Sequence, residues 1–131
     1  MDNRLIAEIN LGLVILLGIG PGDDESKISF LTEKIAFLRI FEDAQGKMNQ
    51  SLLDIHGAAL VVSQFTLFAD TSKGRRPSFT DAALPDIARP LVDNFVQQLI
   101  KLGVSTQQGE FGAHMLVEID NNGPVTIILE R

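Results

Sequence analysis

Two stretches of the chain are apolar on both faces of an extended strand, and they constrain the fold more than any other feature. They are residues 11–17 (LGLVILL) and 58–62 (AALVV). A strand with one face in solvent alternates apolar and polar residues, whereas an uninterrupted apolar run belongs inside a covered sheet. Gly20-Pro21-Gly22 stops the first run. The two stretches therefore predict buried, central strands of a β-sheet.

Helical periodicity surrounds these strands. Apolar residues three to four positions apart predict a helix that Asp23 or Asp24 caps and that carries Leu38 near its end. A second helix begins near Pro85 and ends at Gly103, with Pro90 delaying its start or bending it. The first apolar run is predicted to be the second half of a strand that begins with residues 5–9, and shorter strands are predicted at residues 38–41, 104–107, 115–119 and 125–129. The order β-α-β-β-α-β-β-β predicts a single α/β domain over residues 1–131, a mixed sheet with helices packed on it.

Composition excludes several classes of protein. The formal net charge of −6 argues against a protein that coats nucleic acid, although gripping only one end of a nucleic acid needs no such surface. Without cysteine there is no disulfide or thiolate metal site, and two histidines make a histidine-rich metal cage unexpected. The apolar run at residues 11–19 is about half the length of a membrane span. We expect a soluble, cytoplasmic protein that uses no metal or cofactor.

The sequence matches neither a phosphate-binding loop nor a serine hydrolase triad in the chemistry of its residues. Residues 18–22 (GIGPG) lie between a strand and a helix, as a phosphate-binding loop does, but Asp23, Asp24 and Glu25 would repel a phosphate there. No serine lies in a Gly-x-Ser-x-Gly elbow, so no serine hydrolase triad is indicated. We interpret His56 and His114 as surface or packing residues.

The one basic cluster of the chain, Lys73-Gly74-Arg75-Arg76, admits two interpretations. A short charged run is commonly a solvated loop. Alternatively, it contacts a phosphate near the mouth of a substrate site.

Two polar motifs follow apolar runs. Ser63-Gln64-Phe65-Thr66 places two hydroxyls and an amide at the end of a buried strand, where such groups could orient an ester and stabilise an oxyanion. Taken alone, it is better interpreted as a polar strand end that leads into a loop. Residues 121–126 (NNGPVT) form a turn between two apolar runs, with an unusual Gly-Pro step at the tip of a hairpin. Taken alone, this turn indicates an ordinary trans proline.

Together the two motifs resemble the signatures of D-aminoacyl-tRNA deacylases, Ser-Gln-x-Thr and Asn-x-Gly-Pro-x-Thr. The resemblance extends from about residue 4 to the end of the chain. Its supporting stretches are residues 12–18 (GLVILLG), 41–49 (FEDAQGKMN), 60–70 (LVVSQFTLFAD), 74–79 (GRRPSF) and 109–115 (GEFGAHM).

The resemblance implies an α/β fold with mixed or antiparallel sheets and two main helices packed on one side, in deacylase-type α/β/β layers. It implies a cytoplasmic homodimer that hydrolyses the ester of D-aminoacyl-tRNA, and glycine mischarged on tRNA for alanine, in the chiral proofreading of translation. Gly123 and Pro124, joined by a cis bond, would project into the other subunit's pocket, where their carbonyls reject L-amino acids.

The resemblance also implies the residues of the site. Ser63, Gln64 and Thr66 are the candidate catalytic residues; the candidate substrate-binding residues are Phe65, Phe111, Met115, Asn121, Gly123, Pro124, Val125 and Thr126. Thr66 is either a nucleophile or, because no base lies beside it in the motif, a positioning group for attack by water. The alternatives are a non-catalytic dimeric module that binds tRNA ends or a small ligand, and an unrelated domain with a trans Gly123-Pro124 bond.

One departure concerns the start of the chain. Members of the family begin with an additional strand whose arginine supports the Gly-Pro loop, whereas this sequence opens with Met1-Asp2-Asn3-Arg4. We expect either that this strand is absent or that the true start lies upstream of Met1.

Overall fold

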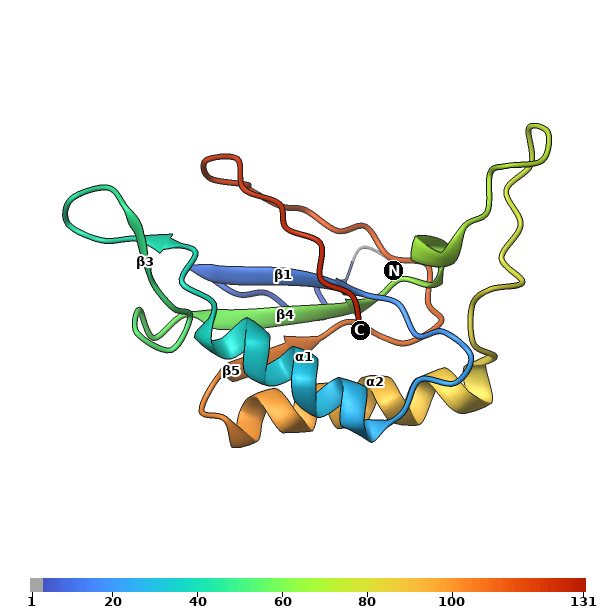
Figure 1. Ribbon diagram of the computed structural model, residues 1–131, viewed down its shortest axis with the longest axis horizontal. Coiled ribbons are helices and arrows are strands. Elements are labelled where there is room, and N and C mark those ends of the chain that lie inside the picture. Colours follow the sequence, from blue (N-terminus) through green and yellow to red (C-terminus); the bar gives the residue numbers. More distant parts are fainter. Residues whose placement is uncertain (1–3) are drawn as a thin grey trace.

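A three-stranded parallel sheet forms the centre of the molecule (Figure 1). The computed structural model describes residues 4–131, so the expectation for the start at Met1 lies outside the described residues. The strands are β1 (Gly12–Leu17), β4 (Ala58–Ser63) and β5 (Ser105–Gln108), in the order β1-β4-β5. β1 and β4 pair from Gly12↔Ala58 to Leu17↔Ser63. Both apolar stretches are thus confirmed as strands, and β4 is the central one. The prediction that the first stretch is also a buried, central strand is wrong for residues 4–131, because β1 lies at an edge of the sheet and is mostly half-buried, with Leu16 44% exposed.

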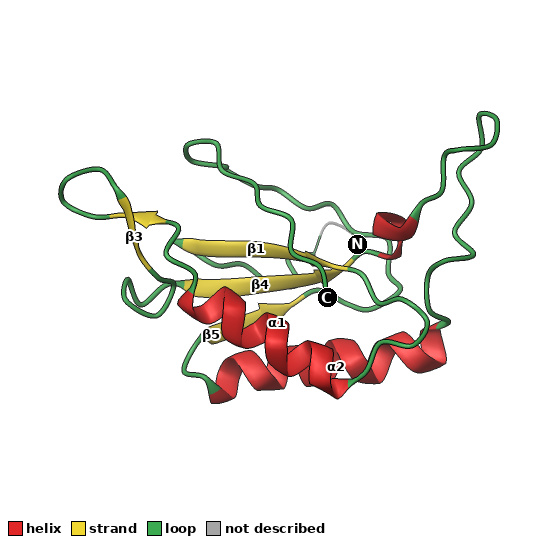
Figure 2. Ribbon diagram, in the orientation of Figure 1, coloured by secondary structure: helices red, strands yellow, loops and turns green. Residues whose placement is uncertain are grey.

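Two helices cover one side of this sheet (Figure 2). Helix α1 (Glu25–Phe37) begins after Asp24, whose carboxylate accepts hydrogen bonds from the backbone N–H groups of Ser26 and Lys27. The Ser26 hydroxyl, followed by these amides, lowers the pKa of the Asp24 carboxyl. Helix α2 (Pro85–Lys101) starts at the predicted proline. Pro90 lies inside this helix and therefore does not delay its start.

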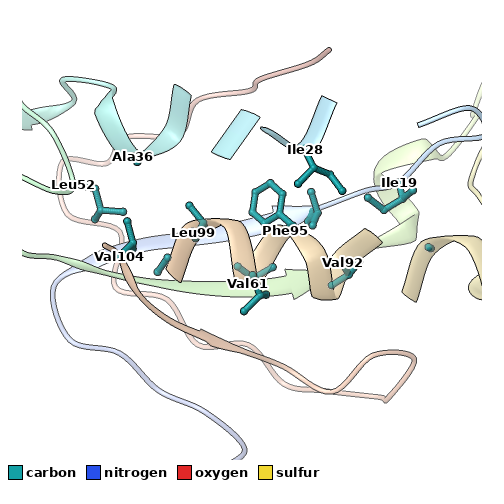
Figure 3. Packing of buried hydrophobic residues seen from close by; sticks show 13 residues of the cluster. Ile19, Ile28, Ala36, Leu52, Val61, Val92, Phe95, Leu99 and Val104 are labelled. Carbon is teal, nitrogen blue, oxygen red and sulfur yellow. The ribbon is translucent and has the colours of Figure 1, made fainter. Parts of the chain in front are cut away.

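The hydrophobic core lies between the helices and the sheet (Figure 3). Phe95 of α2 is 1% exposed and sits among Val61 of β4, Ile28 of α1 and Leu99 of its own helix. These residues come from three separate elements of the chain, so their packing joins both helices to the central strand. The predicted α/β class, with two main helices on one side, is confirmed.

A short antiparallel hairpin follows α1. It consists of β2 (Phe41–Glu42) and β3 (Met48–Gln50). The Asp43 carboxylate closes the turn by accepting the backbone N–H groups of Gln45 and Lys47. The strand predicted at residues 38–41 begins only at Phe41, and β3 was not predicted.

The last 23 residues depart from the predicted order. Residues 109–131, which we call the C-terminal arm, leave β5, run past β1 on the side away from the helices, turn and come back (Figure 1). The predictions of strands at residues 115–119 and 125–129 are wrong for the described chain, and the first predicted strand begins only at Gly12, without its half at residues 5–9. A strand requires a partner backbone, and within residues 4–131 these segments pair with none. Leu116 and Ile128 are consequently 83% and 82% exposed.

We expect Phe95→Ala to lower the free energy of unfolding by about 3–5 kcal/mol, because it removes a large buried side chain and leaves a cavity. Ile87→Ala on the same helix is the control, since Ile87 is 53% exposed; a surface change of this kind shifts stability by about 0.5 kcal/mol or less. Urea unfolding followed by circular dichroism measures both. Equal midpoints for the two variants would contradict the assignment of Phe95 to the core.

Candidate active site

The Ser63-Gln64-Phe65-Thr66 motif lies at the carboxyl end of the central strand. Ser63 is the last residue of β4, and the backbone N–H of Gln64 donates to the Leu17 carbonyl at 2.8 Å. The chain then turns into the 3₁₀ helix η1 (Phe65–Phe68), so strand alternation does not continue through the motif. The carboxyl edge of parallel strands is where ligands commonly meet such sheets. The motif therefore occupies a position suited to binding.

Two side chains of this motif are joined to each other. The Gln64 side-chain amide donates a hydrogen bond to the Thr66 hydroxyl oxygen. Within residues 4–131, the Thr66 hydroxyl has no hydrogen bond to a carboxylate or an imidazole. Ser63 and Gln64 are half-buried, whereas Phe65 and Thr66 are exposed. The motif thus presents hydroxyl and amide groups to solvent, and no base is bonded to Thr66.

The glycines of residues 18–22 position η1. A Cβ atom on Gly18 would lie 2.9 Å from the Phe68 ring, and one on Gly20 would lie 3.0 Å from it. Only glycine therefore lets the ring of Phe68 pack against this loop. The Gly20 N–H donates to the Asp23 carboxylate at 2.7 Å, so the amide that a phosphate would require is already bonded. Both contacts support the rejection of a phosphate-binding loop.

One side chain holds the tip of the C-terminal arm, residues 121–126, in shape. The Asn121 carbonyl oxygen accepts the Val125 N–H at 3.0 Å, and its amide donates to the Thr126 hydroxyl at 3.1 Å. The Gly123-Pro124 peptide bond is cis. Gly123 has φ +133°, a backbone conformation that favours glycine. All six residues of the tip are exposed.

The described chain does not bring the two motifs together. η1 and the tip of the arm lie toward opposite ends of the molecule (Figure 1). The start of the arm is closer to the first motif, because the Gly109 N–H donates to the carbonyl of Val61, two residues before Ser63. Phe111 and Met115 follow on the arm and are both half-buried.

Several residues around the site were not identified from the sequence. The guanidinium of Arg89, on α2, lies 4.8 Å from the centre of the Phe111 ring. The Phe79 ring meets Phe65 edge to face, with 5.1 Å between ring centres. Phe79 ends the matching stretch GRRPSF, which was the one available signal; nothing in the sequence marked Arg89.

A third aromatic contact holds the far end of the arm. The guanidinium of Arg131 lies 4.2 Å from the centre of the Phe30 ring on α1. Cation–π contacts therefore hold the arm to a helix near each of its ends. The large hollow on α1, about 790 Å³, is lined by Phe30, Glu33, Lys34, Phe37, Leu38 and Arg39. None of these residues belongs to either motif.

Neither a cluster of metal ligands nor a membrane-spanning helix occurs in the part of the chain that the structure describes. Over residues 4–131, no three His, Cys, Asp or Glu side chains are placed to hold a metal ion. None of the helices in the same range has the length and apolar character to cross a bilayer.

Comparison with known proteins agrees with this arrangement. The family model described as D-Tyr-tRNA(Tyr) deacylase matches residues 1–130. The chain is 58% identical to a D-aminoacyl-tRNA deacylase of Roseiflexus castenholzii, over 99% of this chain and 83% of the relative. It is 50% identical to one of Limosilactobacillus reuteri, over 100% of this chain and 90% of the relative.

Solved structures share the fold. One titled c-Myc DNA Unwinding Element Binding Protein has a TM-score of 0.90 and 40% identity, covering 96% of this chain and 86% of that one. A probable eukaryotic D-amino acid tRNA deacylase has a TM-score of 0.62 and 17% identity, covering 77% and 74%, and shows the fold alone. Fold and motifs thus define an α/β protein of the deacylase type. The chain belongs to the D-Tyr-tRNA(Tyr) deacylase family, which confirms the resemblance and excludes an unrelated domain.

We expect Asn121→Ala to loosen the tip, because the substitution removes both hydrogen bonds of that side chain. A net contribution of about 0.5–1.5 kcal/mol for a hydrogen bond corresponds to roughly two- to twelvefold faster amide exchange at Val125. Hydrogen exchange measured by NMR tests this, with Asn122→Ala as the matched control. Unchanged protection of Val125 in Asn121→Ala would show that the turn holds its shape without these bonds.

Proposed function

We propose that this protein hydrolyses the ester that joins a D-amino acid to the 3′ end of tRNA, releasing the free D-amino acid and tRNA. The observation that carries the proposal is the Ser-Gln-Phe-Thr motif at the carboxyl end of the central strand, in a chain 58% identical to a named D-aminoacyl-tRNA deacylase. The same site would accept glycine on tRNA for alanine, because glycine has no side chain for a chirality filter to reject. A cytoplasmic location, where aminoacyl-tRNA is used, follows from this activity.

In the proposed reaction, water attacks the ester carbonyl, the bond to the ribose oxygen breaks, and that oxygen takes up the proton. Ser63, Gln64 and backbone N–H groups orient the ester and stabilise the oxyanion. Thr66 positions the substrate rather than attacking it, because Gln64 donates to its oxygen and no base is bonded to it. The 2′-hydroxyl of the RNA assists the water. This scheme uses no metal or cofactor.

The terminal adenosine would bind beside the motif. Phe65 is exposed, and Phe111 follows the segment that is bonded to β4. Aromatic side chains bind unstacked bases by stacking, and Met115 would add an adaptable apolar contact. We therefore assign the adenine site to Phe65, Phe111 and Met115.

Chirality would be read by a second copy of the chain. The tip carrying Gly123 and Pro124 is exposed and lies far from η1 of its own chain, so it would enter the pocket of a partner subunit. The exposed apolar side chains of the arm, including Leu116 and Ile128, are the kind of surface that a homodimer covers. The backbone carbonyls of the tip would exclude an L side chain, while Asn121, Val125 and Thr126 hold the tip in shape.

We expect the purified protein to release D-tyrosine from D-tyrosyl-tRNA and to spare L-tyrosyl-tRNA. Pro124→Ala should reduce this discrimination, because it removes the ring that fixes the backbone of the tip. Release of labelled amino acid from matched D- and L-esters measures both effects. Protection of the D-ester by the wild-type chain would instead favour the non-catalytic module that binds tRNA ends or a small ligand.

Thr66→Ala should slow single-turnover hydrolysis by about ten- to a hundredfold, the effect of losing a positioning group rather than a nucleophile. The control is Thr80→Ala, an exposed threonine outside both motifs and outside the loop of residues 69–79. Rapid-quench measurement of single-turnover rates, with tRNA binding measured in parallel, separates chemistry from affinity. Complete loss of hydrolysis with unchanged tRNA binding would make Thr66 the nucleophile.

A further inference from the structure

Between η1 and α2 the chain projects from the body of the molecule as a narrow stalk, residues 69–79 (Figure 1). Two backbone hydrogen bonds close its base: the Asp70 N–H donates to Ser78 at 2.7 Å, and the Ser78 N–H donates to Asp70 at 2.9 Å. The edge-to-face contact between Phe79 and Phe65 ties the same base to the Ser-Gln-Phe-Thr motif. The stalk is thus in direct contact with the motif that contains the proposed catalytic residues.

Positive charge is concentrated at the end of this stalk. Lys73, Arg75 and Arg76 are all exposed, in a chain with 11 basic and 17 acidic residues. The salt bridge found within residues 4–131 joins Lys27 to Asp23, so the three cations of the stalk have no carboxylate partner there. Gly74, with φ +70°, provides the turn that brings the cations together at the end of the stalk.

We propose that this basic stalk binds the phosphate backbone of the tRNA acceptor strand, which places the ester at the Ser-Gln-Phe-Thr motif. The inference rests on the proposed function. From Asp70 to Gly74 the stalk extends by at most about 13 Å, at roughly 3.3 Å per residue. At about 3.4 Å of rise per nucleotide in a helical strand, this reach corresponds to about four nucleotides. The stalk therefore reaches the backbone just before the terminal adenosine.

The chemistry of the cations fits a phosphate better than a base. Arginine forms paired hydrogen bonds to phosphate oxygens, and such contacts fix register without reading sequence. An enzyme that removes D-amino acids from different tRNAs needs this kind of contact, because the acceptor backbone is common to them. The net negative charge of the chain makes a local basic group the means by which it would hold RNA.

The test replaces two of the cations. Arg75→Gln/Arg76→Gln is compared with Lys47→Gln/Lys101→Gln, which removes the same charge from the β2–β3 turn and the C-terminal end of α2, at the opposite end of the molecule (Figure 1). For D-tyrosyl-tRNA, we expect KM to rise roughly ten- to thirtyfold at 0.1 M salt in the stalk variant, with kcat unchanged. The dependence of log affinity on log salt should become shallower by about 1.4, as expected for two lost contacts to single-stranded RNA.

A small substrate separates binding of the backbone from damage to the site. D-tyrosyl-adenosine carries the same ester but no phosphates, so the stalk variant should hydrolyse it like wild type. A stalk variant that matches the control on tRNA, in both KM and salt dependence, would overturn the proposal and leave a solvated loop. Loss of activity on D-tyrosyl-adenosine would also overturn it, because the effect would then lie in the motif.

Binding of uncharged tRNA distinguishes this proposal from the proposed function. If the wild-type chain binds uncharged tRNA and the stalk variant binds it ten- to thirtyfold more weakly, the stalk proposal stands even where no D-ester is hydrolysed. Equal binding by stalk and control variants refutes it, whatever the hydrolysis assay shows.

Discussion

The parallel pairing of β1 with β4 is the interaction on which the rest of the structure depends. Both strands are apolar, and together they form the surface on which both helices pack. Their approach is close at Gly12, where any Cβ would collide with the Ala58 carbonyl oxygen. The same pairing ends at Leu17 and Ser63, which sets where the polar motif leaves the sheet. The pairing of these two strands thus determines the position of groups that are themselves in contact with solvent.

Features encoded locally could be predicted, and features that depend on distant contacts could not. The apolar runs of β1 and β4, the Asp24 cap and the proline at the start of α2 each act within a few residues, and each was found from the sequence. The C-terminal arm has the alternating pattern of a strand: Phe111, Ala113, Met115 and Val117 are half-buried between exposed neighbours. Its pairing depends on a partner backbone, which a pattern of side chains cannot supply.

The candidate site divides in the same way. The motifs at residues 63–66 and 121–126 were recognisable because each is contiguous in the chain. The contacts that place them come from remote positions: Phe79 on Phe65, Arg89 on Phe111 and Arg131 on Phe30. The distance between the two motifs in the folded chain was likewise not encoded in either of them. Because the two motifs lie far apart in the chain, different contacts hold the tip and the tetrapeptide. A substitution in one motif would therefore leave the contacts of the other within the same chain unchanged.

The contact of Phe68 with Gly18 and Gly20 changes how this glycine-rich loop should be interpreted. Such a loop is ordinarily examined for nucleotides, yet here the missing side chains make room for an aromatic ring from the chain itself. A bulkier residue at either glycine would displace the ring, and with it the short helix that carries Thr66. In a mutational survey these glycines would then resemble residues that contact the substrate, although their role is to leave space beneath the residues proposed to do so.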